Sequence, residues 1–220
     1  MNNSSFYFEK LYPLQDRVLK TIRAVETGFY LTGGTAASRG YLSHRFSDDL
    51  DFFVNDDKRF GLWAERMTQA ISLDSRWQLS VIQKEERFVR LNITENDLAL
   101  KIEMINDVPA RVGQITDHPV LGRLDSAENI LANKITALID REEPKDLADI
   151  WGFCFQRQLS LNEALNNAHS KAAGIFPADL ARLLCSVTVA DWESVRWITP
   201  PPAEVFISQL TSLGEKLVLI

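Results

Sequence analysis

The sequence of 220 residues has little cysteine, only three histidines and no long hydrophobic run. Its two cysteines, Cys154 and Cys185, have neither Cys-x-x-Cys spacing nor a histidine cluster beside them, which argues against a disulfide framework and a zinc site. No segment approaches the roughly 18 apolar residues that span a bilayer. The first ten residues also lack a basic stretch followed by a long apolar run. We therefore expect a cytoplasmic protein with reduced cysteines and no membrane association.

An excess of basic residues is also missing. The chain has 24 Lys and Arg against 30 Asp and Glu, a formal net charge of −6. This balance argues against a protein that wraps nucleic acid by bulk charge, although a local basic groove stays compatible with it. A composition of 45% hydrophobic and 25% charged residues is ordinary for globular proteins, and the length fits one large domain or two small ones.

The most informative stretch runs from Phe29 to Val54. A short apolar run ends at Gly33-Gly34, a segment of small residues follows from Thr35 to about His44, and a second apolar run carries alternating aspartates. This order predicts a strand, a tight turn, a helix and a second strand. Alternation in the second strand places Asp49 and Asp51 on one face, so the two carboxylates can hold a divalent cation together.

Further elements are predicted on both sides of this stretch. Helical spacing of apolar residues indicates helices over Leu11–Val25 and from Phe60 to Ile71. Three strand-like runs follow at Trp77–Lys84, Arg87–Ile93 and Leu98–Ile105. In the last of them, Leu98, Leu100, Ile102 and Met104 share one face, while Lys101 and Glu103 lie on the other. Glu103 is therefore a third carboxylate in the right position for a metal site.

Each of these features also has an ordinary structural explanation. Glycines occur in many strand-to-helix turns for geometric reasons, although Gly33-Gly34-Thr35 also gives backbone N–H groups room to approach a phosphate. Asp49 and Asp51 would repel each other unless a cation, an arginine or backbone donors compensate them, or unless they lie at an exposed strand end. With Glu103 added, metal binding is the better explanation, and hard oxygen ligands favour Mg²⁺ or Mn²⁺.

The second half of the chain reads differently. Pro109–Gly122 is predicted to be an irregular link, and helices are expected after it, beginning at an N-cap in Asp125-Ser126 and at Pro144, and over Ser160–Ala173, Pro177–Val187 and Pro202–Leu217. At about 100° per residue, Lys134 falls inside the apolar arc of its helix. A lysine in that position must extend to solvent or contact an anion.

Four phrases carry a family resemblance: Leu-Thr-Gly-Gly-Thr-Ala, Arg-Phe-Ser-Asp-Asp-Leu-Asp-Phe-Phe, Ala-Glu-Asn-Ile-Leu-Ala-Asn-Lys and Pro-Lys-Asp-Leu-Ala-Asp-Ile-Trp. Over roughly Thr21 to Trp151 the sequence resembles the AbiEii/AbiGii toxin family, within the nucleotidyltransferase superfamily typified by DNA polymerase β. The resemblance implies an α+β fold, with a polymerase β-like mixed sheet and flanking helices in residues 1–115. A helical C-terminal region, residues 116–220, is expected to close one side of the cleft.

The resemblance also implies roles for individual residues. Asp49 and Asp51 match the family's metal pair, to which Glu103 adds a third catalytic carboxylate. Gly34 and Thr35 match the phosphate-binding turn, and Lys134 and Asp146 match the family's lysine and later acidic position. Gly33 belongs to the same turn and is also expected to contribute to nucleotide binding. From the residues alone, Arg39 and Arg45 face a triphosphate or pair with nearby aspartates, Asp146 has an equally good explanation at a helix N-terminus, and His44 is more readily structural than catalytic.

The resulting expectation is a nucleotidyltransferase that uses Mg²⁺ or Mn²⁺ and moves a nucleotide from a nucleoside triphosphate to a hydroxyl group. RNA (tRNA included), a protein and a small molecule are all compatible acceptors. In several members of the family the enzyme is the toxin of a toxin–antitoxin or phage-defence system, which implies a cognate antitoxin. The alternatives are a catalytically inactive nucleotide-binding regulatory module and an enzyme of the antibiotic-modifying type. We expect Asp49, Asp51 and Glu103 to converge within metal-binding reach, with Gly34 opposite them.

Overall fold

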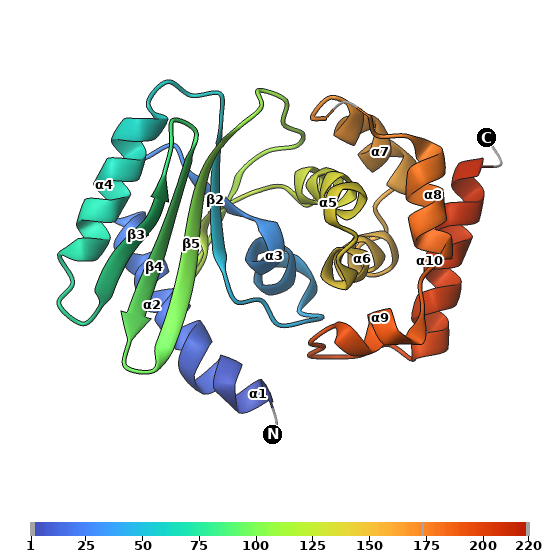
Figure 1. Cartoon of the computed structure of the whole chain (residues 1–220), viewed down its shortest axis with the longest axis horizontal. Coiled ribbons are helices and arrows are strands. Elements are labelled where there is room, and N and C mark those ends of the chain that lie inside the picture. Colours follow the sequence, from blue (N-terminus) through green and yellow to red (C-terminus); the bar gives the residue numbers. More distant parts are fainter. Residues whose placement is uncertain (1–2, 173, 219–220) are drawn as a thin grey trace. The chain divides into compact units, whose positions relative to one another are not determined.

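The computed structural model describes residues 3–172 and 174–218. Its strands all lie between Tyr30 and Leu124, where the last five follow one another without an intervening helix, and the chain after them forms helices (Figure 1). The strands are β1 (Tyr30–Thr32), β2 (Leu50–Asn55), β3 (Gln78–Lys84), β4 (Phe88–Glu95), β5 (Leu98–Asp107), β6 (Thr116–His118) and β7 (Gly122–Leu124). The α-helices are α1 (Asn3–Phe6), α2 (Tyr12–Arg23), α3 (Gly33–Thr35), α4 (Phe60–Ser72), α5 (Ala127–Arg141), α6 (Pro144–Trp151), α7 (Leu161–His169), α8 (Pro177–Cys185), α9 (Val189–Ser194) and α10 (Ala203–Val218), and the π-helical segments are η1 (Tyr7–Leu11), η2 (Ala36–Leu42) and η3 (Gly152–Gln156).

The described residues form two compact units. We call the first the sheet unit; it comprises Met1–Ala36, Ser47–Pro109 and Ile115–Asp125. We call the second the helical unit; it comprises Ala37–Phe46, Ala110–Gln114 and Ser126–Ile220. The helical unit thus includes the segment Ala37–Phe46, which lies within the predicted first domain, residues 1–115.

The sheet unit contains one mixed sheet in the order β3-β4-β5-β2-β1-β7-β6. Strand β2 pairs antiparallel with β1 and parallel with β5, so the aspartate strand lies at the centre. Helices α2 and α4 cover one face of the sheet (Figure 1). With helices on a mixed sheet, the predicted α+β fold class is confirmed.

Alternation decides which side chains of the central strands are buried. Leu50, Phe52 and Val54 of β2 are at most 4% exposed, and Leu100, Ile102 and Met104 of β5 are fully buried. The core between sheet and helices is completed by apolar side chains of α2 and α4: Leu14, Val18, Leu19, Ile22, Phe60, Trp63, Met67 and Ile71. The opposite face of β2 and β5 therefore carries the polar residues.

The segment predicted to be an irregular link is partly ordered as sheet. Strand β6 lies within Pro109–Gly122, and β7 begins at Gly122 and pairs parallel with β1 through Leu31 and Leu124. This part of the prediction was wrong because strands of three residues are too short to show alternation, and Pro119 lies in the turn of a hairpin.

The helical unit contains the helices predicted for the second half of the chain. Helix α5 is capped at its N-terminus by Ser126, whose side chain accepts a hydrogen bond from the Asn129 N–H, and at its C-terminus by Glu142 in the left-handed conformation. The short helix α9 was not predicted, and the expected end of a helix at Ala173 lies outside the described residues. Within the described part of the chain, no helix is long and apolar enough to cross a membrane.

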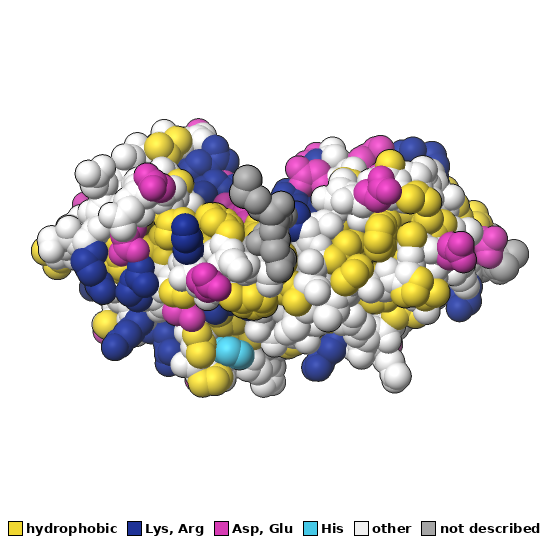
Figure 2. Space-filling view, turned by 90° about the horizontal axis from the view of Figure 1, so that it is seen from below, with side chains coloured by type: hydrophobic (Ala, Val, Ile, Leu, Met, Phe, Trp, Pro, Cys, Tyr) yellow, Lys and Arg dark blue, Asp and Glu magenta, His cyan; other side chains and the backbone are white. Residues whose placement is uncertain are grey.

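Exposed charges of both signs are interspersed with apolar side chains on the face shown in Figure 2. Several Lys and Arg side chains gather at the lower left of this view, where fewer Asp and Glu side chains are seen, so the formal net charge of −6 does not describe this part of the surface.

Candidate active site

The glycine turn lies directly against the aspartate strand. Gly33 has φ +67°, and a Cβ atom built on it would lie 2.1 Å from Asp51 Oδ2. Both the left-handed backbone and this close approach require glycine at the position. Strand pairing also keeps the turn next to Asp51, because Thr32, the residue before the turn, is the register partner of Asp51. The turn therefore holds the Asp51 carboxylate at the start of helix α3.

Thr35 connects the turn to the residues that precede β2. Its side chain is buried, and its hydroxyl donates to the backbone carbonyl of Asp49 and shares a hydrogen bond of 3.0 Å with Ser47 Oγ. In this structure the Thr35 hydroxyl fixes the Ser47–Asp49 segment. The threonine that was predicted as part of a phosphate-binding turn thus has a clear positioning role.

Glu103 lies beside Asp51 on the neighbouring strand. The two residues are register partners in the parallel pair β2–β5, so their side chains project from the same face of the sheet. On the other side, Arg90 of β4 is the register partner of Glu103 and donates from Nε to Glu103 Oε1 over 2.7 Å. Adjacent strands thus align Asp51, Glu103 and Arg90 across the sheet.

Lys101 lies between the carboxylates. It is two residues before Glu103 on β5 and therefore on the same face. Its ammonium is 2.9 Å from Asp49 Oδ2 and 3.4 Å from Glu103 Oε1. Burial works to lower the pKa of Lys101, but the hydrogen bond to Asp49 and the negative charges of Asp49, Glu103 and Asp51 outweigh it and raise that pKa. Lys101 is a charged ammonium held by two carboxylates.

We call Asp49, Asp51, Arg90, Lys101 and Glu103 the carboxylate face. Its hard oxygen donors fit a divalent cation, and they already hold one cation, the ammonium of Lys101. As the side chains stand, however, no group of three or more His, Cys, Asp or Glu within residues 3–172 and 174–218 could hold a metal ion. The predicted convergence of Asp49, Asp51 and Glu103 within metal-binding reach is therefore not found in this arrangement, in which Lys101 lies between Asp49 and Glu103.

Lys134 lies in a second group of charges, in the helical unit. Its ammonium is 2.8 Å from Asp146 Oδ1 and 2.7 Å from Asp149 Oδ2. Arg45 donates to Asp149 through Nε and Nη2, at 2.7 and 2.6 Å, and His44 Nε2 lies 3.0 Å from Asp149 Oδ1. We call these five residues the buried ion cluster, since each is at most 5% exposed.

The pKa values of Asp149 and His44 in the buried ion cluster are both lowered. Burial alone would raise the pKa of Asp149, but the charges of Arg45 and Lys134 and the hydrogen bonds from His44 and Arg45 hold it well below its usual value. Burial lowers the pKa of His44, so the ring is neutral at pH 7 and donates from Nε2 to Asp149. Its Nδ1 has no hydrogen-bond partner among the described residues. The predicted structural role of His44 agrees with this geometry.

Arg90, Lys101 and Asp149 were not predicted from the sequence to be site residues. Arg90 could have been found only from the register of the β4–β5 hairpin, and Asp149 only from the contacts of Arg45 and Lys134. Lys101 did have a signal, since it shares the face of Glu103. The metal and nucleotide roles assigned from the sequence to Asp49, Asp51, Glu103, Gly33, Gly34, Thr35, Arg39, Lys134 and Asp146 stay predictions.

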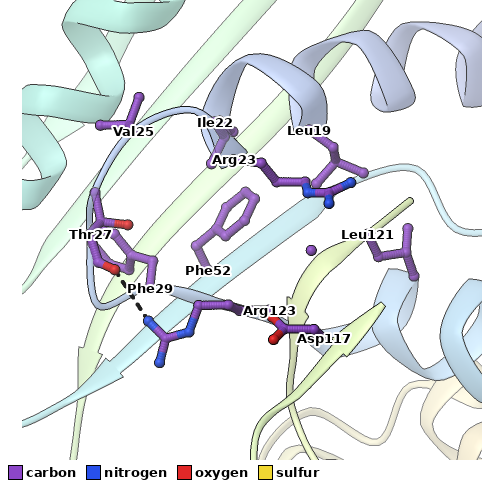
Figure 3. Close-up of a pocket in the computed structure, with 11 residues that line it drawn as sticks. Leu19, Ile22, Arg23, Val25, Thr27, Phe29, Phe52, Asp117, Leu121 and Arg123 are labelled. Atoms are coloured by element: carbon purple, nitrogen blue, oxygen red, sulfur yellow. Dashed lines mark hydrogen bonds between the residues drawn. The ribbon is translucent and has the colours of Figure 1, made fainter. Parts of the chain in front are cut away.

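A hollow of about 260 Å³ in the sheet unit lies away from these carboxylates (Figure 3). Its lining includes Leu19 of α2 and Phe52 of β2. Because Phe52 and Asp51 are successive residues of one strand, the hollow and the carboxylate face are on opposite faces of the sheet. Two arginines at the hollow donate to backbone carbonyls, Arg23 to Pro119 and Arg123 to Thr27. The hollow is not part of the candidate active site.

Comparison with solved structures identifies the fold. JHP933 from Helicobacter pylori is 19% identical, with a TM-score of 0.65, over 94% of this chain and 90% of that one. A putative nucleotidyltransferase from H. pylori is 18% identical, with a TM-score of 0.65, over 99% and 96%. MenT4, a nucleotidyltransferase toxin from Mycobacterium tuberculosis H37Rv, is 18% identical, with a TM-score of 0.66, over 96% and 83%. The fold is that of the nucleotidyltransferase toxins.

The sequence identifies the family. The model of the nucleotidyl transferase AbiEii toxin family, described as type IV toxin–antitoxin, matches residues 17–183, and the chain belongs to this family. The resemblance found in the sequence is confirmed. None of the curated proteins matches the chain.

Proposed function

We propose that this chain is a metal-dependent nucleotidyltransferase that moves a nucleotide from a nucleoside triphosphate to a hydroxyl acceptor, as the toxin of a toxin–antitoxin pair. One observation carries the proposal: adjacent strands have Asp51 and Glu103 as register partners, Lys101 bridges Glu103 and Asp49, and the neighbouring turn requires glycine at position 33. Membership of a nucleotidyl transferase family supports the same reaction.

In the proposed reaction the acceptor hydroxyl oxygen attacks the α-phosphorus of the triphosphate. The bond from that phosphorus to the bridging oxygen of the β-phosphate breaks, pyrophosphate leaves, and the hydroxyl proton passes to a base or to solvent. Asp49, Asp51 and Glu103 would hold Mg²⁺ or Mn²⁺, which supplies positive charge for the phosphates when bound. Glu103 Oε1 is fixed by Arg90 and Lys101, which suits it to orient the hydroxyl.

The turn would contribute to binding the triphosphate. The positive φ of Gly33 leaves the backbone at the start of α3 without a side chain, so backbone N–H groups there have room to approach an anion. We do not assign a phosphate to Lys134, because its ammonium already contacts two carboxylates. Its proposed role is to position α5 against α6.

The test measures transfer of label from α-labelled nucleoside triphosphates, with Mg²⁺, to total cellular RNA, to protein and to small hydroxylated amines in parallel. We expect wild-type protein to label one acceptor class and Asp51→Asn to lose the labelling and any toxicity on expression. Asp97→Asn, in the exposed β4–β5 turn, is the matched control and should behave as wild type.

The other outcomes discriminate between the candidate functions. Labelling of a hydroxylated amine alone would indicate an antibiotic-modifying type of enzyme. Thermal stabilisation by nucleotides with no labelling and no pyrophosphate release would indicate a regulatory module and would overturn the proposal. Rescue of growth by a neighbouring small reading frame would support the antitoxin partner.

A further inference from the structure

We propose that Lys101 is a built-in counter-ion that occupies the cation position between Asp49 and Glu103 and must leave Asp49 before a divalent metal binds. The proposal rests on the function proposed above, since it concerns the same carboxylates. It adds a residue that controls when the metal is bound: in the free protein the lysine competes with the metal.

Lys101 already contacts two carboxylates of the carboxylate face. The Lys101 ammonium is 2.9 Å from Asp49 Oδ2 and 3.4 Å from Glu103 Oε1, which places one cation in contact with carboxylates on two adjacent segments of the sheet. A divalent metal ion held by the same two oxygen atoms would need the same space. The ammonium and the metal therefore exclude each other while Lys101 keeps this position.

The backbone of β5 fixes the face on which Lys101 lies, but its side chain can change conformation. It is fixed to the face by alternation, since its neighbours Leu100 and Ile102 are fully buried on the other side of β5. The backbone therefore cannot turn Lys101 away, but the side chain is free to move because it is long and 39% exposed. Lys101 can release Asp49 through a change of side-chain rotamer alone.

The ion pair between Lys101 and Asp49 is weak enough to be replaced. A partly exposed ion pair between Lys101 and Asp49 contributes little to stability, so its replacement by a divalent ion is favourable once the ion is bound by further ligands. The phosphates of a nucleotide are such ligands, and they also offer the released ammonium a new anion. Metal and nucleotide should therefore bind together more readily than the metal alone, which keeps the free protein largely metal-free.

The test measures Mn²⁺ binding without nucleotide, by the electron paramagnetic resonance signal of free Mn²⁺, with wild type, Lys101→Met and Lys101→Arg. We expect Lys101→Met to bind Mn²⁺ about tenfold more tightly than wild type, because a positive charge next to the metal is removed. Lys101→Arg keeps a cation and should bind no more tightly than wild type. Lys84→Met is the control and should leave the Mn²⁺ affinity unchanged. It removes an exposed lysine of β3 that pairs with Glu65 of α4.

An affinity of Lys101→Met within twofold of wild type, or below it, would overturn the inference, as would an absence of Mn²⁺ binding to both proteins at millimolar concentration. Circular dichroism confirms that the variants are folded. These measurements involve neither nucleotide nor turnover, so the proposed function can fail independently. It fails if wild type transfers no label in the presence of nucleotide, whatever the Mn²⁺ affinities are.

Discussion

Replacement of Lys134 by methionine distinguishes two roles for the lysine of α5. The family resemblance implies that Lys134 contacts a nucleotide phosphate, whereas in the structure it bridges Asp146 and Asp149 at 2.8 and 2.7 Å. Methionine keeps most of the aliphatic stem and removes the charge. If the lysine mainly holds α5 to α6, this substitution should cost stability whether or not a nucleotide is present.

The magnitude follows from what each carboxylate keeps. Removing one partner from a buried ion pair typically costs about 3–5 kcal/mol, because a charge is left buried without compensation. Asp149 keeps both hydrogen bonds from Arg45, and Asp146 keeps those from Arg141. The cost should therefore lie at the lower end, about 3 kcal/mol, which is a large part of the about 5–15 kcal/mol that stabilises a typical domain.

Urea denaturation followed by circular dichroism and tryptophan fluorescence measures the free energy of unfolding of Lys134→Met. Lys145→Met is the matched control, because Lys145 lies in the first turn of α6, the helix that carries Asp146 and Asp149. Its side chain is 45% exposed and pairs with Glu143, so the substitution should change the free energy of unfolding by less than about 1 kcal/mol. A Lys134→Met protein as stable as this control, with nucleotide binding lost, would refute the positioning role.

Two further predictions follow from the sites. Gly33→Ala should lower the free energy of unfolding, measured by heat or urea, by about 1–3 kcal/mol, because the residue has φ +67° and the new Cβ would meet a carboxylate oxygen of Asp51. Gly61→Ala is the control and should not destabilise the protein, because the space around its Cβ position is open. Equal stability of the two variants would contradict this geometry. Burial lowers the pKa of His44 in the folded protein below its usual value of 6.5, so at mildly acidic pH the unfolded chain binds more protons than the folded one. The contribution of neutral His44 to stability is therefore fully present above pH 6.5, and it is lost as the pH falls through that value towards the folded pKa. Stability should thus fall from pH 7.5 to pH 5.5 by up to about 1.4 kcal/mol per pH unit, and His44→Gln should lose this part of the slope; an unchanged slope in the variant would assign it to other groups.

Alternation of apolar residues was enough to predict the central strands and their faces. The same reasoning could have gone further in the β4–β5 hairpin. The structure closes it with a two-residue turn, Asn96-Asp97, in which Asn96 has φ +53°, and this turn pairs Glu95 with Leu98. Counting back from that pair places Arg90 opposite Glu103. The strands predicted at Arg87–Ile93 and Leu98–Ile105 left four residues between them, so the predicted turn was too long to give the register that pairs Arg90 with Glu103.

Other features could not be read from local sequence. Whether residues 37–46 belong with the sheet or with the helices depends on long-range contacts such as those of Arg45 with Asp149. Periodicity showed that Lys134 lies among apolar residues and needs an anion, but two carboxylates from α6 satisfy that requirement as well as a phosphate would. Only the tertiary structure distinguishes these anions.

Exposure separates the two groups of charges by what they can do. In the buried ion cluster Asp146 and Asp149 are fully buried and Lys134 is 5% exposed, so releasing an ion costs several kcal/mol and the contacts should persist through turnover. On the carboxylate face, the side chains of Asp49 and Lys101 are 37% and 39% exposed. A pair with that much solvent typically contributes only about 0–1 kcal/mol. The carboxylate face can therefore exchange one cation for another at little cost, as the proposed binding of a metal and a nucleotide would require, whereas the buried ion cluster is suited to holding helices in place.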